Sequence, residues 1–147
     1  MIEAGFPASS PGERELFKKL SKEGLSAKLC GLCRADIGDI DAAIDSGADY
    51  VHTFIATSDL HMKFKLKMTP EQVLAKAVGA VEHVKSRGVE CEFSCEDATR
   101  SDAGFAIRVY KAAADAGAGM LNVPDTVGTS TPEAFGKLVA RVAEETR

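Results

Sequence analysis

Short apolar segments alternate along the chain with stretches of helical periodicity. Runs rich in β-branched, aromatic and other apolar residues are typical of strands. They occur at 2–6, 28–35, 50–57, 89–94 and 120–123. Because helical segments separate these runs, we expect a parallel sheet with right-handed crossover connections.

Apolar residues recur at helical spacing between the strands and predict helices. These are expected at 13–22, 39–46, 69–88, 102–116 and from 131 towards the C-terminus. The third helix has the clearest boundaries, because Thr69 and Gln72 form a capping box and Pro70 fits the first turn. The expected buried positions of the first and last helices are Leu16, Phe17, Leu20, Phe135, Leu138 and Val142.

Residues 61–67 fit neither pattern and predict a loop. Lysine and apolar residues alternate here, at Met62, Lys63, Phe64, Lys65, Leu66 and Lys67. The bland interpretation is a solvated face. The alternative is a phosphate-binding segment, for example for the tail of coenzyme A.

The order of β/α units fits either a doubly wound sheet or a (β/α)8 barrel. No G-x-G-x-x-G follows any strand, which counts against a dinucleotide-binding fold. We therefore expect 1–147 to be a single domain, a partial (β/α)8 TIM barrel of about five β/α units with parallel strands. So few units cannot close a barrel, and their open edges predict a homo-oligomer.

Composition narrows the classes of function. Hydrophobic residues make up 45% and charged residues 27%, which is typical of a globular domain rather than a disordered chain. The net charge of −4 offers no basic surface for nucleic acid or for a membrane. The apolar runs are too short to span a bilayer and no signal peptide is evident, so we expect a cytoplasmic location.

The four cysteines, Cys30, Cys33, Cys91 and Cys95, leave two interpretations. Paired spacing suggests a zinc site. However, both pairs fall in expected strands, where residues three apart point to opposite faces and cannot share an ion. Small buried thiols in a reducing compartment are the preferred interpretation.

Polar residues gather where the strands are expected to end. In parallel α/β folds these ends carry the working residues. The residues in question are Glu3, Arg34, His52, Thr57, Ser58, Glu92, Ser94, Glu96, Asp97, Asn122, Asp125 and Thr126. Buried polar groups need partners, so one shared catalytic rim explains the pattern better than core packing does.

Individual roles stay open on the pattern alone. His52 fits either a hydrogen-bonded core residue or a site residue. Glu96 and Asp97 are paired carboxylates suited to acid–base or metal chemistry, but capping or a salt bridge with Arg100 is an equal alternative. Thr126 also fits a simple turn hydroxyl.

Four motifs at the strand ends resemble the 2-isopropylmalate synthase family. They are I-E-A-G-F-P at 2–7, H-T-F-I-A-T-S at 52–58, E-F-S-C-E-D-A-T-R at 92–100 and N-V-P-D-T-V-G at 122–128. They occur in order and cover nearly the whole chain. Together they are specific for the group of 2-isopropylmalate, citramalate and homocitrate synthases, and 52–67 is less similar to the related aldolases and lyases.

The resemblance implies a barrel that condenses acetyl-CoA with a 2-oxo acid at a divalent metal such as Mg, Mn or Zn. It implies catalytic roles for Glu3 and Glu96. It also implies contacts to the 2-oxo acid from Arg34, His52, Ser94 and Thr126. Glu92 stands where homocitrate synthases of the lysine route tend to have arginine, so 2-isopropylmalate or citramalate synthase is favoured.

The chain departs from this family at the metal site. The family's first strand supplies a catalytic arginine and a metal-binding aspartate, and its seventh strand supplies a His-x-His pair. The histidines of this chain are His52, His61 and His83, with no such pair. We therefore expect the second to sixth barrel units without metal ligands, and no activity from this chain alone.

Overall fold

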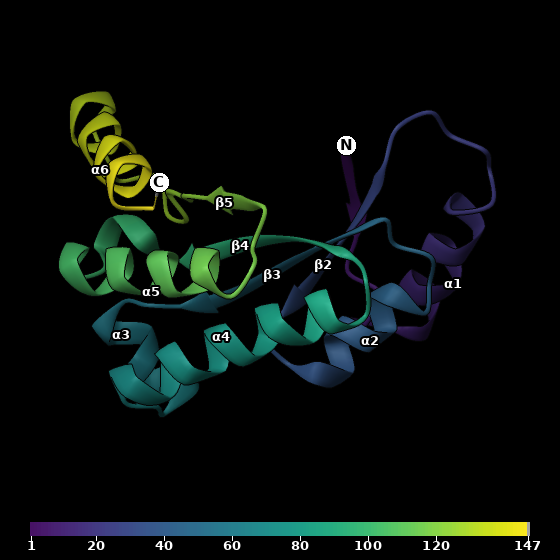
Figure 1. The fold of residues 1–147 in the computed structure, drawn as a ribbon, viewed down its shortest axis with the longest axis horizontal. Coiled ribbons are helices and arrows are strands. Elements are labelled where there is room, and N and C mark those ends of the chain that lie inside the picture. The colour runs from purple at the N-terminus through teal and green to yellow at the C-terminus, as the bar shows by residue number, and fades with distance from the viewer. Residues whose placement is uncertain (147) are drawn as a thin grey trace.

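The computed structural model describes residues 1–146 and contains a sheet of five parallel strands (Figure 1). The strands are β1 (Ile2–Gly5), β2 (Leu29–Arg34), β3 (Tyr50–Ala56), β4 (Glu90–Glu96) and β5 (Met120–Asn122). They lie side by side in chain order. Each strand is joined to the next through at least one helix, so the predicted alternation and the parallel sheet are confirmed.

Five helices match the predicted segments to within a few residues, namely α1 (Pro11–Leu20), α2 (Ile37–Ile44), α4 (Pro70–Ser86), α5 (Ala103–Asp115) and α6 (Pro132–Glu145). A short helix, α3 (Asp59–His61), was not predicted. A π-helix, η1 (Met62–Leu66), follows α3, and a 3-10 turn, η2 (Ala98–Arg100), follows β4. The predicted capping box is present, since Thr69 and Gln72 each bond the backbone N–H of the other.

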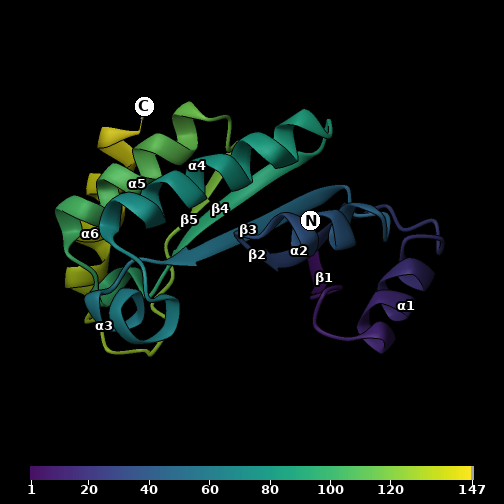
Figure 2. The ribbon, with the colours of Figure 1, turned by 90° about the horizontal axis from the view of Figure 1, so that it is seen from below.

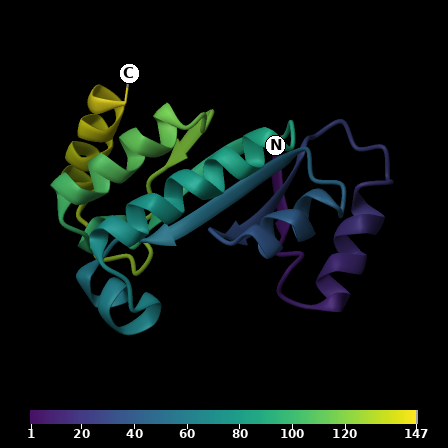
Figure 3. The same cartoon turned by 60° about the horizontal axis from the view of Figure 1, so that its bottom comes forward.

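The core lies between the sheet and the helices that pack on it. Figure 3 shows α4 running along β3, and α4 also contacts β4. The Phe93 ring of β4 meets the Tyr110 ring of α5 edge-on, with centroids 6.2 Å apart. Gly31 lets α2 approach β2 closely, because a methyl group there would lie 2.9 Å from Cβ of Ala43.

The strand register brings polar residues level with one another. His52 pairs with Glu92 across β3 and β4, and Ser94 pairs with Asn122 across β4 and β5. Side chains alternate between the faces of a strand, so these residues lie on the face opposite to Phe93. The register therefore gathers the polar residues on the face that does not carry the core.

The segment predicted as a loop at 61–67 is helical, so that expectation is wrong. Ser58 caps α3, and the chain continues through η1 to Lys67, which adopts a left-handed conformation at φ 54°. A π-helix is held by hydrogen bonds between residues five apart and is found in short pieces, often at functional sites. Alternating lysines reveal no such spacing, which is why the sequence pattern missed it.

Two expectations about burial are also wrong. Leu16 is 50% exposed although Phe17 beside it is buried, because α1 lies next to the edge strand β1 at one end of the molecule (Figure 2). Phe135 and Leu138 are only half-buried, because α6 lies at the other end, while Val142 is buried as predicted. α1 and α6 thus bury fewer of their apolar residues than their sequences predict.

The sheet is open at both sides within residues 1–146. β1 pairs only with β2 and β5 pairs only with β4 in this part of the chain. Ile2 on β1 and Met120 on β5 are 49% and 44% exposed. In the described residues, no helix combines the length and apolar character that crossing a membrane requires.

Candidate functional site

A pocket of about 280 Å³ lies at the carboxyl ends of the strands. It is lined by Glu3, Leu32, His52, Phe54, Ser94, Glu96, Asn122, Pro124 and Thr126. Five of the six predicted site residues are among them, and Arg34 is the exception. Each of the five strands, or the segment that follows it, contributes at least one lining residue, and β2 contributes Leu32. The predicted shared rim is therefore a contiguous surface, called the His52 pocket below.

His52 is buried and holds the pocket floor together. Its Nδ1 is hydrogen-bonded to Glu3 and its Nε2 lies 2.5 Å from Oγ of Ser94. Glu92 is also buried, with Oε1 3.8 Å from Nδ1 of His52 and 3.1 Å from Nδ2 of Asn122, from which it accepts a hydrogen bond. The imidazole thus has polar partners that themselves line or support the pocket, and its hydrogen bonds fit both a core residue and a site residue.

Glu96 ends β4 and contacts Lys65, which the sequence pattern assigned to a solvated face. Nζ of Lys65, in η1, donates to both carboxylate oxygens of Glu96 at 2.7 and 2.8 Å. The Glu96 side chain is 20% exposed and that of Lys65 is 49% exposed. The lysine therefore neutralises Glu96 at the pocket wall, and the interpretation of Lys65 as part of a solvated face is incomplete.

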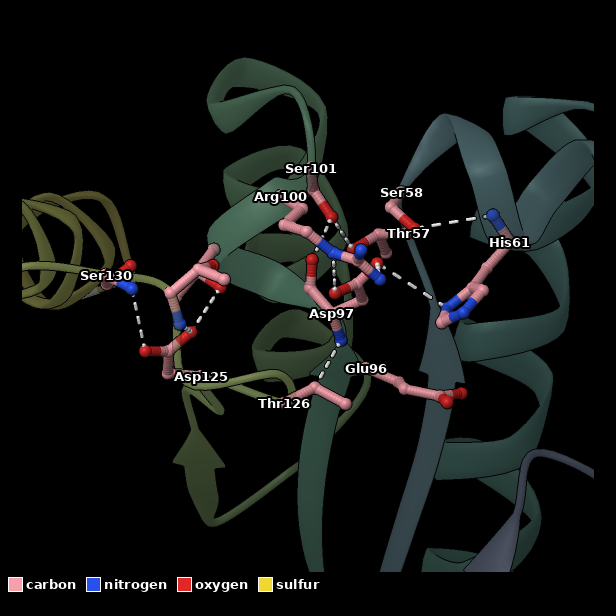
Figure 4. Close-up of polar contacts among 12 residues, drawn as sticks. Thr57, Ser58, His61, Glu96, Asp97, Arg100, Ser101, Asp125, Thr126 and Ser130 are labelled. Carbon is pink, nitrogen blue, oxygen red and sulfur yellow. Dashed lines mark hydrogen bonds and ion pairs between the residues drawn. The ribbon is translucent and has the colours of Figure 1, made fainter.

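Asp97 follows Glu96 but is directed into the protein (Figure 4). Its carboxylate is fully buried and accepts from Nε and Nη2 of Arg100 at 2.7 and 2.9 Å. Nδ1 of His61 lies 3.6 Å away. Burial alone would raise the pKa of Asp97, but hydrogen bonds from Arg100 and Ser58 hold it below its ordinary value. Of the two interpretations of Asp97, the salt bridge is confirmed.

Thr126 reaches the pocket from the segment after β5. Its Oγ1 accepts a hydrogen bond of 2.9 Å from the Asp97 N–H (Figure 4). The neighbouring Asp125 is anchored by the Thr99 hydroxyl at 2.8 Å and by the Ser130 N–H at 3.0 Å. These two bonds, with the Ser130 N–H the larger influence, hold the pKa of Asp125 below its ordinary value.

Arg34 lies outside the His52 pocket. Its guanidinium binds Asp39 at 2.6 and 3.0 Å and sits 5.6 Å from the centre of the Phe6 ring. It lines an adjoining pocket of about 530 Å³, where Lys65 and Glu96 are also found. The structure thus places Arg34 at the side of the mouth, separated from His52.

Within residues 1–146, no three His, Cys, Asp or Glu side chains come together in a way that could hold a metal ion. The cysteines are buried free thiols, and burial raises the pKa of Cys30 and Cys91 to about 12. The described residues therefore do not fit the divalent metal that the resemblance implies, and the zinc interpretation of the cysteines gains no support.

A parallel sheet of β/α units with polar side chains gathered at its carboxyl edge defines a barrel-type α/β protein. The HMGL-like family matches residues 1–147, and the chain belongs to that family.

Several 2-isopropylmalate synthases are similar to this chain over nearly its whole length. The 2-isopropylmalate synthases of Methanocaldococcus jannaschii and Pyrococcus furiosus are both 52% identical to it, over 99% and 95% of this chain. That of Sulfolobus acidocaldarius is 49% identical over 99%. The chain spans 28%, 29% and 38% of the length of these three relatives, respectively.

Solved structures confirm the partial barrel. Hydroxymethylglutaryl-CoA lyase from Pseudomonas aeruginosa superposes with a TM-score of 0.79 at 20% identity, over 97% of this chain and 50% of that one. The lyase from Bacillus subtilis gives 0.77 at 14% identity, over 95% and 50%. At these identities the likeness concerns the fold.

Proposed function

We propose that this chain is the 2-oxo acid-binding part of a 2-isopropylmalate synthase-type acyltransferase of leucine biosynthesis, acting in the cytoplasm. The reaction is a Claisen condensation of acetyl-CoA with a 2-oxo acid. The observation that carries the proposal is the His52 pocket, in which residues of the four motifs meet at one strand edge. The identity of about 50% to 2-isopropylmalate synthases supports the substrate class.

The pocket divides into binding and proton-handling groups. Thr126, Ser94 and His52 are proposed to hydrogen-bond the 2-oxo acid, because all three residues line one cavity. Glu96 is proposed to accept the proton that leaves the acetyl methyl group as its carbon attacks the ketone carbon. Glu3 fixes His52 through its hydrogen bond. Water then cleaves the thioester and releases the coenzyme A thiol.

The adjoining pocket of about 530 Å³ carries charged side chains beside the His52 pocket. Arg34 and Lys65 line it together with Glu96, so it opens directly beside the proposed proton acceptor. We propose that Arg34 helps to hold anionic substrate there. Its ion pair with Asp39 fixes the guanidinium in place before any ligand arrives.

We propose that this chain alone does not turn over. The family reaction needs a divalent metal, and the described residues offer no set of ligands for one. The test is release of free thiol from acetyl-CoA with 2-oxoisovalerate, pyruvate or 2-oxoglutarate, in the presence of Mg²⁺ or Mn²⁺. No release is expected, and clear release with any acid would overturn this proposal.

The same assay distinguishes 2-isopropylmalate, citramalate and homocitrate synthases when it is run on a form that binds the metal. The acids that identify them are 2-oxoisovalerate, pyruvate and 2-oxoglutarate, respectively.

For the chain itself, NMR spectra recorded with each acid show where that acid binds. We expect shifts at Thr126 and Ser94 with 2-oxoisovalerate, and weaker shifts in His52→Ala. His83→Ala, which changes a histidine that bonds Asp41 of α2 and does not line the pocket, is the matched control. Equal shifts in both variants would contradict the assigned pocket.

We further propose that the chain self-associates through its open edges. Exposed Ile2 and Met120 flank the two unpaired strand edges found within residues 1–146. Exposed strand backbone with apolar side chains favours pairing with another chain. Sedimentation should show a species larger than a monomer, and Ile2→Lys together with Met120→Lys should shift it towards the monomer. A well-folded monomer of the unaltered chain at high concentration would contradict the proposal.

A further inference from the structure

The direction of the hydrogen bond to Thr126 decides what its hydroxyl can do next. A threonine hydroxyl has one hydrogen and two acceptor lone pairs. The bond from the Asp97 N–H, at 2.9 Å, occupies one lone pair. Within the part of the chain that the structure describes, the Thr126 hydroxyl hydrogen is not donated to another residue. It remains available to an oxygen atom in the His52 pocket, which Thr126 lines.

The donor of that bond sits in an unusual backbone conformation. Asp97 has φ 64° and ψ 33°, in the left-handed region that residues with a Cβ atom rarely adopt. The conformation ends β4 at Glu96 and turns the chain into η2. One result is that the N–H faces Thr126 while the side chain of the same residue points into the protein (Figure 4).

The surrounding groups hold Asp97 in this conformation. Arg100 clamps the carboxylate with two hydrogen bonds. The Asp97 carbonyl accepts from the Ser101 hydroxyl at 2.9 Å, and Ser101 in turn lies 2.7 Å from the Thr57 hydroxyl at the end of β3. Strained backbone of this kind persists only where its neighbours determine it, and it is common at binding sites.

We propose that Asp97 is a positioning residue whose anchored left-handed backbone makes Thr126 a hydrogen-bond donor for a carboxylate in the His52 pocket. The carboxylate is that of a 2-oxo acid, and this identity of the ligand rests on the proposed function. The link between Asp97 and Thr126 does not, because it is a property of the free protein. Asp97 does not line the pocket, and it acts on the ligand only through its hydrogen bond to Thr126.

Two substitutions at Asp97 separate positioning from simple stabilisation. Both Asp97→Ala and Asp97→Gly remove the carboxylate, but only glycine adopts a positive φ without strain. NMR coupling constants and the methyl shift report the χ1 rotamer of Thr126. We expect one rotamer in the unaltered chain, rotamer averaging in Asp97→Ala, and a return towards one rotamer in Asp97→Gly. Asp115→Asn, on the outer part of α5, is the control for loss of a charge.

A purely structural role predicts that both substitutions lower the free energy of unfolding and leave the Thr126 rotamer of the folded chain unchanged. Equal rotamer averaging in Asp97→Ala and Asp97→Gly, or an unchanged rotamer in both, overturns the proposal. These measurements need no ligand. They therefore test the positioning role even if the proposed substrate is wrong.

Binding of 2-oxoisovalerate supplies the second readout. Asp97→Ala should weaken binding about tenfold, the size of one hydrogen bond, and Asp97→Gly should recover most of that loss. Thr126→Val should weaken binding similarly, and adding Asp97→Ala to it should change little further, since both act through one hydroxyl. Losses that multiply in the double variant overturn the coupling. Absence of binding by the unaltered chain counts against the proposed ligand, and the rotamer result then decides the positioning role.

Discussion

Lys65 donates to both carboxylate oxygens of Glu96, at 2.7 and 2.8 Å, although the two residues lie 31 positions apart in the chain. The bond joins the π-helix after β3 to the last residue of β4. It therefore ties a helical segment that the sequence pattern missed to the wall of the candidate site.

Replacing Lys65 should loosen η1 with little effect on global stability. Lys65→Met removes an ion pair whose lysine is 49% exposed, so we expect the free energy of unfolding to fall by less than about 1 kcal/mol. Amide hydrogen exchange over residues 62–66 should nevertheless become several-fold faster. Lys65→Arg should restore slow exchange. The matched control is Lys63→Met, and equal acceleration in that variant would show that Glu96 does not hold the segment.

The hydroxyl group of Tyr110 should contribute strongly to the free energy of unfolding. The hydroxyl accepts from the Cys95 N–H at 3.2 Å and donates to the Asn122 carbonyl at 2.8 Å, which bridges β4 and β5. Tyr110→Phe leaves these buried backbone groups without a partner, so urea unfolding should show a loss of about 1–3 kcal/mol. Tyr50→Phe should lose much less. Similar losses in both variants would argue against the bridge.

The thiols should resist alkylation while the chain is folded. Burial raises the pKa of Cys30 and of Cys91 to about 12, so at pH 8 both thiols stay almost entirely in the unreactive protonated form. Burial also raises the pKa of Cys33 and Cys95. Mass spectrometry should find no iodoacetamide adducts at pH 8, and adducts at all four cysteines after unfolding in urea. Rapid modification of the folded chain would contradict the burial of these groups.

Acid should weaken the fold through aspartates whose pKa is lowered by folding. The Leu29 N–H, at 2.9 Å, lowers the pKa of Asp49, and Lys28 adds to the effect. A group with a depressed folded pKa stabilises the fold above its unfolded pKa, near 4, and that contribution is lost as pH falls through the folded value. Asp49→Asn should therefore be less stable than the unaltered chain at pH 7, and the difference should vanish towards pH 2.

Urea unfolding at a series of pH values measures this difference directly. Asp115→Asn serves as the control, since Asp115 lies on the outer part of α5. A difference between Asp49→Asn and the unaltered chain that stays constant down to pH 2 would show that ionisation of Asp49 is not its source.

Much of the fold was predictable because its strands and helices have simple periods. The apolar run at 50–57 and the capping box at Thr69 gave boundaries close to those of β3 and α4. The π-helix was not predictable, because its repeat matches neither alternation nor ordinary helical spacing. Leu16 and Phe135 were misjudged for a different reason, since burial of an end helix depends on what lies beside it.

The site was predictable as a rim but not as a network. Polar residues at strand ends pointed to His52, Ser94 and Thr126, which do line one pocket. The role of Lys65 and the turn at Asp97 depend on contacts between distant segments and on one backbone angle. Neither leaves a pattern in the sequence. Arg34 was predicted from its place at a strand end, but it lines the adjoining pocket and not the His52 pocket.

The order of the strands has a consequence for how the chain acquires its structure. Every strand pairs with the strand before or after it in the sequence. A parallel pair needs a crossover segment between its strands, so pairing sequential strands keeps the loops that must close as short as those segments allow. Each of these units can dock on the unit before it as it leaves the ribosome. By the same logic the three-residue β5 and the outermost β1, each held from one side, should be the first to fray.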